Sequence, residues 1–381
     1  MQKINKRILI SAGELSGDIH ASILVKEITK LSPKTAFYGM GGKLMQESGV
    51  DILVDSSDLN IIGGIEIISK LIKLILALLT MRNSIRHKSK RPDLLILVDY
   101  PGFNLLLAKI AKRVGVKVLY YISPKIWAWN RGRVQIIKKY VDIMAVIFPF
   151  EVEFYKKYGI PVYFVGNPLL KKVVPKLSKE TAKQIFNLNP NCKIIGLFPG
   201  SRHSEIRRLL PIMLKAAQIL KNKDPTLQFL LSQASSITDN DLLPYLQVSP
   251  IKPKIISGQN YDAMQVCDVI IAASGTITLE ITLMNVPLVI IYTMSWIEYQ
   301  LAKNLIKIPY VGLCNILANK KIAPELLQKE ASPIKIANTV CTILSNKKLY
   351  RQIKIDLQNV KKYLQNKEKI DISKVIMEVL K

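Results

Sequence analysis

The chain has 381 residues, too many for one comfortable hydrophobic core and about right for two domains. Hydrophobic residues make up 49% and charged residues 22%, a balance that excludes disorder, a collagen-like repeat and a coiled coil as the main architecture. The 55 lysines and arginines outnumber the 28 aspartates and glutamates. The net charge of +27 predicts attraction to phosphates or to an anionic membrane surface.

Short apolar runs bear on localisation. The run Ile8–Ile10 is too short for a secretory signal and fits a first buried strand. Charged residues at Glu66, Lys70 and Lys73 interrupt the longest apolar stretch, 61–79, so it is not predicted to span a membrane. The four cysteines are scattered without a C-x-x-C pair, which favours a reduced, cytosolic compartment.

Strand-length apolar runs alternate with helix-length segments along the whole chain. Predicted strands are Arg7–Ser11, Leu94–Asp99, Val116–Tyr121, Ile143–Ile147, Tyr163–Val165, Ile194–Phe198, Leu227–Leu231, Val269–Ala272 and Pro287–Ile291. Predicted helices are His20–Leu31, Phe103–Arg113, Arg131–Lys139, Ser204–Asn222 and Thr276–Met284. This repetition predicts an α/β protein with doubly wound parallel sheets. The turn 166–168 and the lysine-rich 171–183 look like the crossing between two domains, and 346–381 is expected to form one or two outer helices.

Two loops in the first half follow predicted strands, where open α/β sheets bind ligands. In the loop 11–18, two glycines permit a tight turn, and Ser16 or Asp18 is suited to cap the next helix. The dinucleotide pattern G-x-G-x-x-G is absent there, and a plain capped loop is the alternative. Asp99 ends a hydrophobic strand, where apolar surroundings raise a carboxyl pKa and suit a general base, although a helix-capping role remains open.

Two loops in the second half are suited to anions. At 198–206 a strand runs through Pro-Gly-Ser into a helix start, whose N–H groups and dipole favour phosphate, and Arg202 adds a forked donor. At 273–280, hydroxyl side chains again lie at a helix start, and Glu280 lies one turn on, where it is placed to accept hydrogen bonds from a ribose. Ordinary helix caps are the alternative in both. Asp239 and Asp241 are interpreted as helix-capping residues, and no essential divalent metal is expected.

The motifs together resemble those of the lipid-A-disaccharide synthase family. They are GELSGD at 13–18, VDYPGFN at 98–104, ISPKIWAWNRGR at 122–133, FPFE at 148–151, GNPL at 166–169, PGSRHSEI at 199–206, ASGTITLE at 273–280 and CNILANKKIAPELLQ at 314–328. Leu15 departs from the expected threonine. The resemblance implies a GT-B glycosyltransferase, with two Rossmann-like domains facing each other across a cleft. It implies an acceptor domain at 1–167, a UDP-sugar domain at 168–345 and outer helices at 346–381.

The resemblance also implies the reaction and the roles of residues. UDP-2,3-diacylglucosamine would be condensed with 2,3-diacylglucosamine 1-phosphate (lipid X), with inversion to a β-1,6 linkage and release of UDP. Asp99 would be the base and Arg202 the clamp on the departing UDP, with no cofactor or metal. Expected substrate-binding residues are Glu14, Ser16, Gly17, Asp18, Ser201, Ser274, Gly275, Thr276, Glu280 and Asn315. Trp127 and Trp129 are open to a core role or to sugar contact.

The polar residues of 61–80 share one narrow helical sector, which predicts an interfacial helix whose apolar side includes Leu71, Leu74, Ile75 and Leu78. Cations between Arg82 and Arg91 follow it and suit anionic headgroups, although a helix buried between domains is the alternative. We therefore expect a cytoplasmic protein, peripheral to the inner membrane of a Gram-negative bacterium. A UDP-sugar epimerase of the same fold is the alternative function. Dispersed lysines argue against nucleic-acid binding, and a homodimer is left open.

Overall fold

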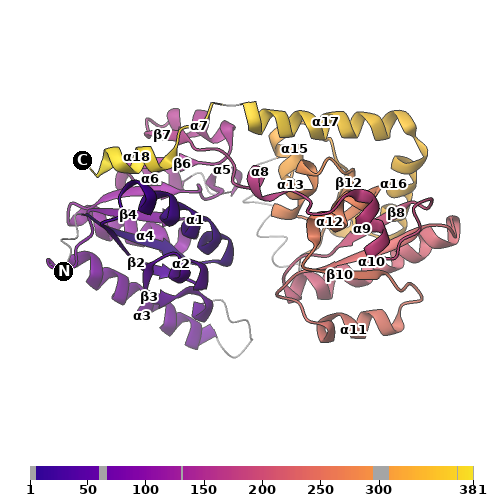
Figure 1. The fold of residues 1–381 in the computed structure, drawn as a ribbon, viewed down its shortest axis with the longest axis horizontal. Helices are drawn as coiled ribbons and strands as arrows, with labels where there is room; N and C mark the ends of the chain where they lie inside the picture. Colours follow the sequence, from indigo (N-terminus) through magenta and orange to yellow (C-terminus); the bar gives the residue numbers. More distant parts are fainter. Residues whose placement is uncertain (1–5, 60–66, 130–131, 295–308, 367, 381) are drawn as a thin grey trace. The chain divides into compact units, whose positions relative to one another are not determined.

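The computed structural model describes residues 6–59, 67–129, 132–294, 309–366 and 368–380. The chain divides into two compact units, one made of Met1–Pro168 with Lys367–Lys381 and the other of Leu169–Asn366. Each unit is built around a sheet whose paired strands are all parallel, with helices on its faces (Figure 1).

The first unit holds a seven-stranded sheet in the order β3-β2-β1-β4-β5-β6-β7. Its strands are β1 (Lys6–Ala12), β2 (Thr35–Gly41), β3 (Val50–Asp55), β4 (Leu94–Val98), β5 (Lys117–Tyr121), β6 (Ile143–Val146) and β7 (Val162–Phe164). Every residue of β4 is buried, as expected for a strand covered on both faces. Strands β2 and β3 were not among the predicted ones, because glycines and charged residues interrupt their apolar pattern.

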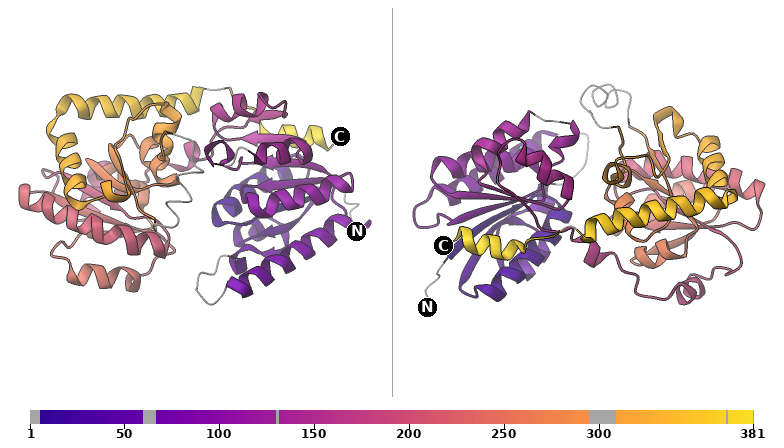
Figure 2. Two further views of the ribbon diagram at one scale, coloured as in Figure 1. Left: turned by 180° about the vertical axis from the view of Figure 1, so that it is seen from behind. Right: turned by 90° about the horizontal axis from the view of Figure 1, so that it is seen from above.

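Helices cover both faces of this sheet (Figure 2). They are α1 (Leu15–Leu31), α2 (Lys43–Glu47), α3 (Ile67–Arg86), α4 (Pro101–Arg113), α5 (Ile126–Trp129), α6 (Arg133–Tyr140), α7 (Pro149–Lys156) and α18 (Ile372–Val379), with a 3-10 turn η1 (Ser56–Leu59). Apolar residues of α1, α2 and α18 form one core cluster with the sheet, and those of α3, α4, α6 and α7 form the other.

The second unit holds a six-stranded sheet in the order β10-β9-β8-β11-β12-β13. Its strands are β8 (Ile194–Phe198), β9 (Gln228–Gln233), β10 (Lys254–Ser257), β11 (Val269–Ala273), β12 (Leu288–Tyr292) and β13 (Glu325–Leu327). Its helices are α8 (Leu169–Lys172), α9 (Lys179–Ile185), α10 (His203–Lys223), α11 (Asp239–Val248), α12 (Asn260–Val266), α13 (Thr276–Leu283), α15 (Leu313–Ala318), α16 (Pro333–Ser345) and α17 (Lys347–Asn366), with a 3-10 turn η2 (Gln328–Glu330). Helix α10 packs against α16, and α17 packs against α13 and α15.

The C-terminal tail is shared between the units, which corrects the expectation of a separate outer segment at 346–381. Helix α17 belongs to the second unit, whereas the chain from 367 onward belongs to the first. Ile372, Val375 and Ile376 of α18 are buried in the same core cluster as α1. Helix α18 is therefore part of the core of the first unit. Among the helices of the described ranges, none combines the length and the apolar character that a membrane crossing requires.

The two sheets share a feature that places the four loops of interest. In the first unit the chain leaves β1 toward β2 and leaves the neighbouring β4 toward β5, on the opposite side. In the second unit β8 and its neighbour β11 diverge in the same way. Ligands bind open α/β sheets at the carboxyl ends of such diverging strands. The loops after β1 and β4, and those after β8 and β11, therefore lie at the two switch points.

Candidate functional site

The loops after β1 and β4 touch at the switch point of the first unit. Asp99 and Tyr100 both adopt left-handed backbone conformations, with φ of 44° and 47°. Pro101 begins α4 and disfavours the right-handed helical conformation at the preceding tyrosine. A Cβ atom added to Gly13 would lie 2.3 Å from Cδ1 of Tyr100. Glycine is therefore required after β1 so that this ring can pack against the loop.

A buried polar network supports the Asp99 turn. The backbone carbonyl of Asp99 accepts hydrogen bonds from the Tyr120 hydroxyl at 2.6 Å and from Asn104 Nδ2 at 2.7 Å. The Ser11 hydroxyl donates to Asn104 Oδ1 at 2.6 Å. All three side chains are 0% exposed. No local sequence pattern predicts this network, because Ser11 and Asn104 lie 93 residues apart in the chain.

The pKa of the Asp99 carboxyl lies well above its ordinary value. Burial raises its pKa to about 6, and the nearby Glu14 carboxylate adds to the rise. The Lys125 ammonium and the Tyr100 backbone N–H act in the opposite direction. A carboxyl with such a pKa is a candidate general base with a stated physical cause. The rise agrees with what the apolar strand end predicts.

The predicted residues of the 13–18 loop separate into different roles. Glu14 and Ser16 are exposed at the start of α1, and Leu15 is 64% exposed beside them. A Cβ on Gly17 would lie 3.3 Å from the Ala12 Cβ, so its glycine lets α1 pack closely on β1.

Asp18 requires a correction, because its carboxylate does not face the loop as a free ligand group. It is 2% exposed and accepts backbone hydrogen bonds from Gly42 at 2.8 Å and from Leu44 and Met45 at 3.1 Å. Both of its oxygens therefore hold the start of α2. This is a structural role, and direct contact with substrate is not assigned to Asp18.

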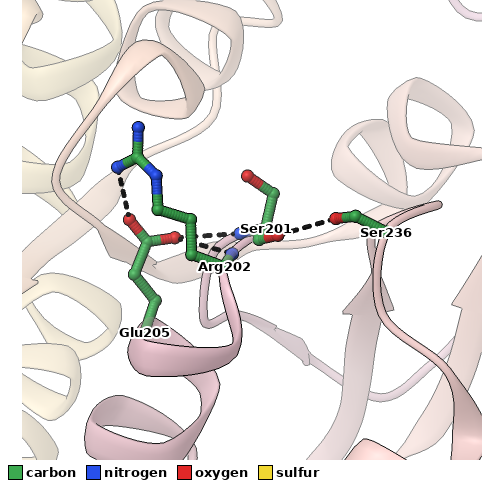
Figure 3. A network of polar contacts seen from close by, with 4 residues as sticks. All are labelled: Ser201, Arg202, Glu205 and Ser236. Atoms are coloured by element: carbon green, nitrogen blue, oxygen red, sulfur yellow. Dashed lines mark hydrogen bonds and ion pairs between the residues drawn. The ribbon is translucent and has the colours of Figure 1, made fainter. Parts of the chain in front are cut away.

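The start of α10 differs from the open phosphate site expected there (Figure 3). Glu205 reaches back from the first turn, and its Oε2 accepts from the backbone N–H groups of Ser201 at 2.9 Å and Arg202 at 3.2 Å. Its Oε1 meets Arg202 Nη1 at 3.2 Å. Ser236 donates its hydroxyl to the Ser201 carbonyl at 2.6 Å. Two N–H groups expected to bind phosphate thus bind a carboxylate of the chain itself, while the Arg202 side chain stays 67% exposed.

The start of α13 is more open than that of α10. Gly275 is the N-cap, and within the described ranges no side chain caps this helix. The Thr278 hydroxyl donates to the Gly275 carbonyl at 2.8 Å, and Ser274 donates to Val311 at 3.3 Å. Thr276 is exposed. Among the described residues, no side chain binds the N–H groups of Thr276 and Ile277, so water or an anion can bind them, and the helix dipole favours an anion.

Glu280 lies on α13, partly buried beside Tyr261 and under the influence of Lys172. Burial raises the pKa of its carboxyl, and the Lys172 ammonium and the Tyr261 hydroxyl lower it. The Tyr261 hydroxyl lies 3.5 Å from Glu280 Oε1, a long hydrogen bond. Such a loosely held carboxylate is free to accept hydrogen bonds from a ligand.

Asn315 also requires a correction. It was expected to reach a bound donor, yet its side chain is 0% exposed and all of its polar atoms are engaged. Oδ1 accepts from the backbone of Ile322 at 2.8 Å and Ala323 at 2.9 Å, and Nδ2 donates to Glu325 and to the Ala323 carbonyl, both at 2.8 Å. Glu325 in turn accepts from the N–H groups of Val311 and Gly312. Asn315 therefore fixes the segment 322–325 that follows α15, and Glu325 holds the loop before α15.

The remaining candidates have internal partners. Trp127 is buried and donates to Glu151 at 3.0 Å, which favours its core role over sugar contact, while the Trp129 side chain lies outside the described residues. Asp241 caps α11 through Thr238 and meets His203 Nδ1 at 3.0 Å, and Asp239 accepts from Gln233 at 2.9 Å. In the part of the chain that the structure describes, no histidine, cysteine, aspartate and glutamate side chains cluster as a metal site would.

Comparison with solved structures defines the class of protein. The chain resembles the calicheamicin glycosyltransferase CalG4 with a TM-score of 0.59 at 10% identity, covering 100% of this chain and 99% of that one. A glycosyltransferase from Rickettsia africae gives a TM-score of 0.57 at 14% identity, with both chains fully covered. A UDP-GlcNAc 2-epimerase from Neisseria meningitidis gives 0.61 at 12% identity over 98% and 99% of the two chains. The fold is that of the GT-B glycosyltransferases.

Sequence relatives narrow the class to one family. The family model described as lipid-A-disaccharide synthetase matches residues 8–379. A lipid-A-disaccharide synthase from Geobacter metallireducens is 50% identical over 87% of this chain and 86% of its own. One from Coxiella burnetii is 43% identical over 91% of both. The chain therefore belongs to the lipid-A-disaccharide synthase family and is a glycosyltransferase, while the epimerases share only its fold.

Proposed function

We propose that the chain transfers 2,3-diacylglucosamine from its UDP conjugate to the 6-hydroxyl of 2,3-diacylglucosamine 1-phosphate, with inversion. The products are a β-1,6-linked disaccharide 1-phosphate and UDP. Membership of the family supports this reaction. The observation that carries it is the contrast between the two switch points, a carboxyl with a raised pKa at Asp99 and an uncapped helix start at Gly275.

Asp99 is the proposed base in the first unit. It takes the proton from the 6-hydroxyl while that oxygen forms a bond to the anomeric carbon of the donor. The bond from the anomeric carbon to the UDP oxygen breaks, and UDP leaves with the electron pair. Asp99 must be ionised for this step, so turnover rises with pH through about 6, the pKa of its carboxyl.

The second unit is proposed to hold the donor. The N–H groups at the start of α13 and the exposed guanidinium of Arg202 would stabilise the charge that develops on the departing diphosphate. Glu280 would accept hydrogen bonds from the ribose hydroxyls. Ser201, Ser274 and Thr276 line the same two loops. In the first unit, Glu14 and Ser16 are the exposed residues proposed to meet the acceptor, beside Gly17.

The test is transfer itself. The purified protein is given UDP-diacylglucosamine labelled in its sugar, with and without the acceptor 1-phosphate, and both UDP and disaccharide are measured. We expect equal amounts of UDP and disaccharide, formed only when acceptor is present. Conversion of the labelled donor to an isomer without acceptor would favour the epimerase alternative. Failure to form disaccharide at pH 8 would contradict the proposed reaction.

A lipid surface is the proposed partner of α3. Leu71, Ile72, Ile75, Leu76 and Leu79 are 41–57% exposed on this helix. The structure corrects the expected face, because Leu74 and Leu78 pack against the core of the first unit. Residues 61–66 of the predicted segment lie outside the described residues. Exposed cations follow the apolar face: Arg86, Lys88, Lys90 and Arg91.

We infer from this pattern a peripheral contact with an anionic membrane, the cytoplasmic face of the inner membrane in a Gram-negative cell. The triple variant Leu71→Ser, Ile75→Ser and Leu76→Ser should bind less to vesicles of zwitterionic and anionic phospholipid while keeping its melting temperature. The matched control replaces three apolar residues of the second unit that are 57–83% exposed with serine: Ile185, Val248 and Ile334. Equal vesicle binding by the two triple variants would contradict the inference.

A further inference from the structure

Three buried polar side chains beneath the Asp99 turn have no part in the reaction described above. Tyr120 and Asn104 both donate to the Asp99 carbonyl, at 2.6 Å and 2.7 Å, and so occupy both of its lone pairs. The Ser11 hydroxyl bonds Asn104 Oδ1 and thereby sets which way the amide faces. We propose that Tyr120, Asn104 and Ser11 are positioning residues, which hold the Asp99 turn in its reactive conformation.

The turn needs such support because its backbone is strained. Left-handed conformations are costly for residues other than glycine, and here two follow one another at Asp99 and Tyr100. Strained backbone persists only where the surrounding structure holds it in place. The two donors to the Asp99 carbonyl supply that hold from the buried side, and the Asn104 backbone N–H adds a bond of 3.1 Å to the Tyr100 carbonyl.

The support acts on the backbone and leaves the carboxylate available. Asn104 also spans the switch point, because its Nδ2 lies 3.3 Å from the Ser11 carbonyl on β1 and 3.2 Å from the Val98 carbonyl on β4. By contrast, both carboxylate oxygens of Asp18 accept hydrogen bonds from backbone N–H groups at the start of α2. Because Tyr120 and Asn104 bind the backbone carbonyl of Asp99, they fix the turn and leave the side-chain carboxylate available to accept a proton.

The position of the turn decides what surrounds the carboxylate. Glu14 faces Asp99 from the start of α1, and Lys125 faces it from the loop after β5. Tyr100 is the next residue in the chain. Tyr120 lies on the buried side of the turn, and the positive charge of Arg133 on α6 acts to lower the pKa of the Tyr120 hydroxyl. A relaxed turn would move the carboxylate out of its desolvated position, and water would then favour its ionised form.

This inference rests on the proposed function for its kinetic test. Tyr120→Phe removes one donor to the Asp99 carbonyl and keeps the ring. Tyr155→Phe is the matched control, because Tyr155 is also fully buried in the same core cluster and its hydroxyl pairs with Ser123 at 2.6 Å. We expect Tyr120→Phe to lower kcat about tenfold with both KM values nearly unchanged, and to move the acid limb of kcat down by roughly half a pH unit. Tyr155→Phe should leave both unchanged.

If the kcat and pH profile of Tyr120→Phe match those of Tyr155→Phe, the inference is wrong. Should Tyr120→Phe fail to fold, Ser11→Ala tests the same network, with a lowered kcat and a lowered acid limb again expected. A substrate-free measurement separates this inference from the proposed reaction. In a ¹³C titration, the Asp99 carboxyl signal, assigned by its absence in Asp99→Asn, should have its midpoint near 6 and lower in Tyr120→Phe. An unchanged midpoint would overturn the inference, whereas absent transfer by the wild type would overturn only the reaction.

Discussion

The two switch points have the same topology and opposite chemistry. At the first, neutral side chains hold a backbone carbonyl, so that the Asp99 carboxyl is left partly buried with a raised pKa. At the second, the Glu205 carboxylate holds the backbone N–H groups of Ser201 and Arg202 before α10, and the start of α13 is left uncapped. We therefore expect the functional groups to be the Asp99 carboxyl at the first switch point and the start of α13 at the second.

The largest effect is expected at the first switch point. Asp99→Asn should lower turnover by a factor of about 10²–10⁴, because the amide cannot accept the proton of the acceptor. The affinity for UDP should not change, since the donor is assigned to the other unit. Steady-state assays measure the turnover, and calorimetric titration with UDP measures the affinity. Turnover close to that of the wild type would reassign Asp99 to the turn alone.

Arg202→Ala tests the second switch point and should cost about 2–4 kcal/mol of transition-state stabilisation. Arg207→Ala is the control, because Arg207 is exposed on α10, the helix that Arg202 precedes. Its kcat/KM should be close to that of the wild type. The measurement is kcat/KM for both variants, with the fold checked by circular dichroism. If both arginines prove equally dispensable, the guanidinium of Arg202 is only a partner of Glu205.

Asn315→Ala separates a structural role from substrate binding. Because its buried amide holds the segment 322–325 that follows α15, its loss should destabilise the protein by about 2–3 kcal/mol, or roughly 4–12 °C in Tm. The donor KM should change little at a temperature where the variant is folded. Asn359→Ala, exposed on α17, provides the control. An unchanged Tm with a large rise in donor KM would restore the predicted substrate contact.

Asp99→Asn should also stabilise the protein above pH 6. The folded state raises the pKa of Asp99 from 3.8 to about 6, so ionisation disfavours folding. The stability that the protonated form contributes is present below pH 4 and lost as the pH rises through 6. Asparagine cannot ionise, so the free energy of unfolding of the variant should exceed that of the wild type by about 1–3 kcal/mol at pH 8 and should equal it at pH 4. Denaturant unfolding at the two pH values measures this, and equal differences at both would show that burial of the charge is not the cause.

The smallest effect is expected on removal of divalent metal. EDTA should leave the rate of transfer unchanged, because an uncapped helix start and Arg202 are assigned to the departing UDP. Activity that disappears in EDTA and returns with Mg²⁺ would bring Asp239 and Asp241 back into consideration, despite their capping bonds.

The sequence predicted what depends on local pattern. Buried runs such as those of β4 and β8 are apolar throughout, and the loops after them are visible because Gly, Pro and hydroxyl residues follow. Strands β10 and β13 were missed because they are short, with β10 mostly exposed and β13 only partly buried. The substrate-binding roles of Asp18 and Asn315 were expectations from the family resemblance, and the partners of both side chains, in α2 and at 322–325, are set by the tertiary fold. The Ser11–Asn104–Tyr120 network was not predicted because it, too, is set by the tertiary fold.

The division of the tail has a consequence for the order in which the protein is completed on the ribosome. The core of the first unit contains Ile8 and Ile10 from the first strand synthesised and Val375 and Ile376 from the last helix. At the usual speed of translation, those ends appear roughly 20–80 s apart. The first unit is therefore completed only after the second. Until α18 has been synthesised, the apolar residues of α1 that pack against it stay exposed.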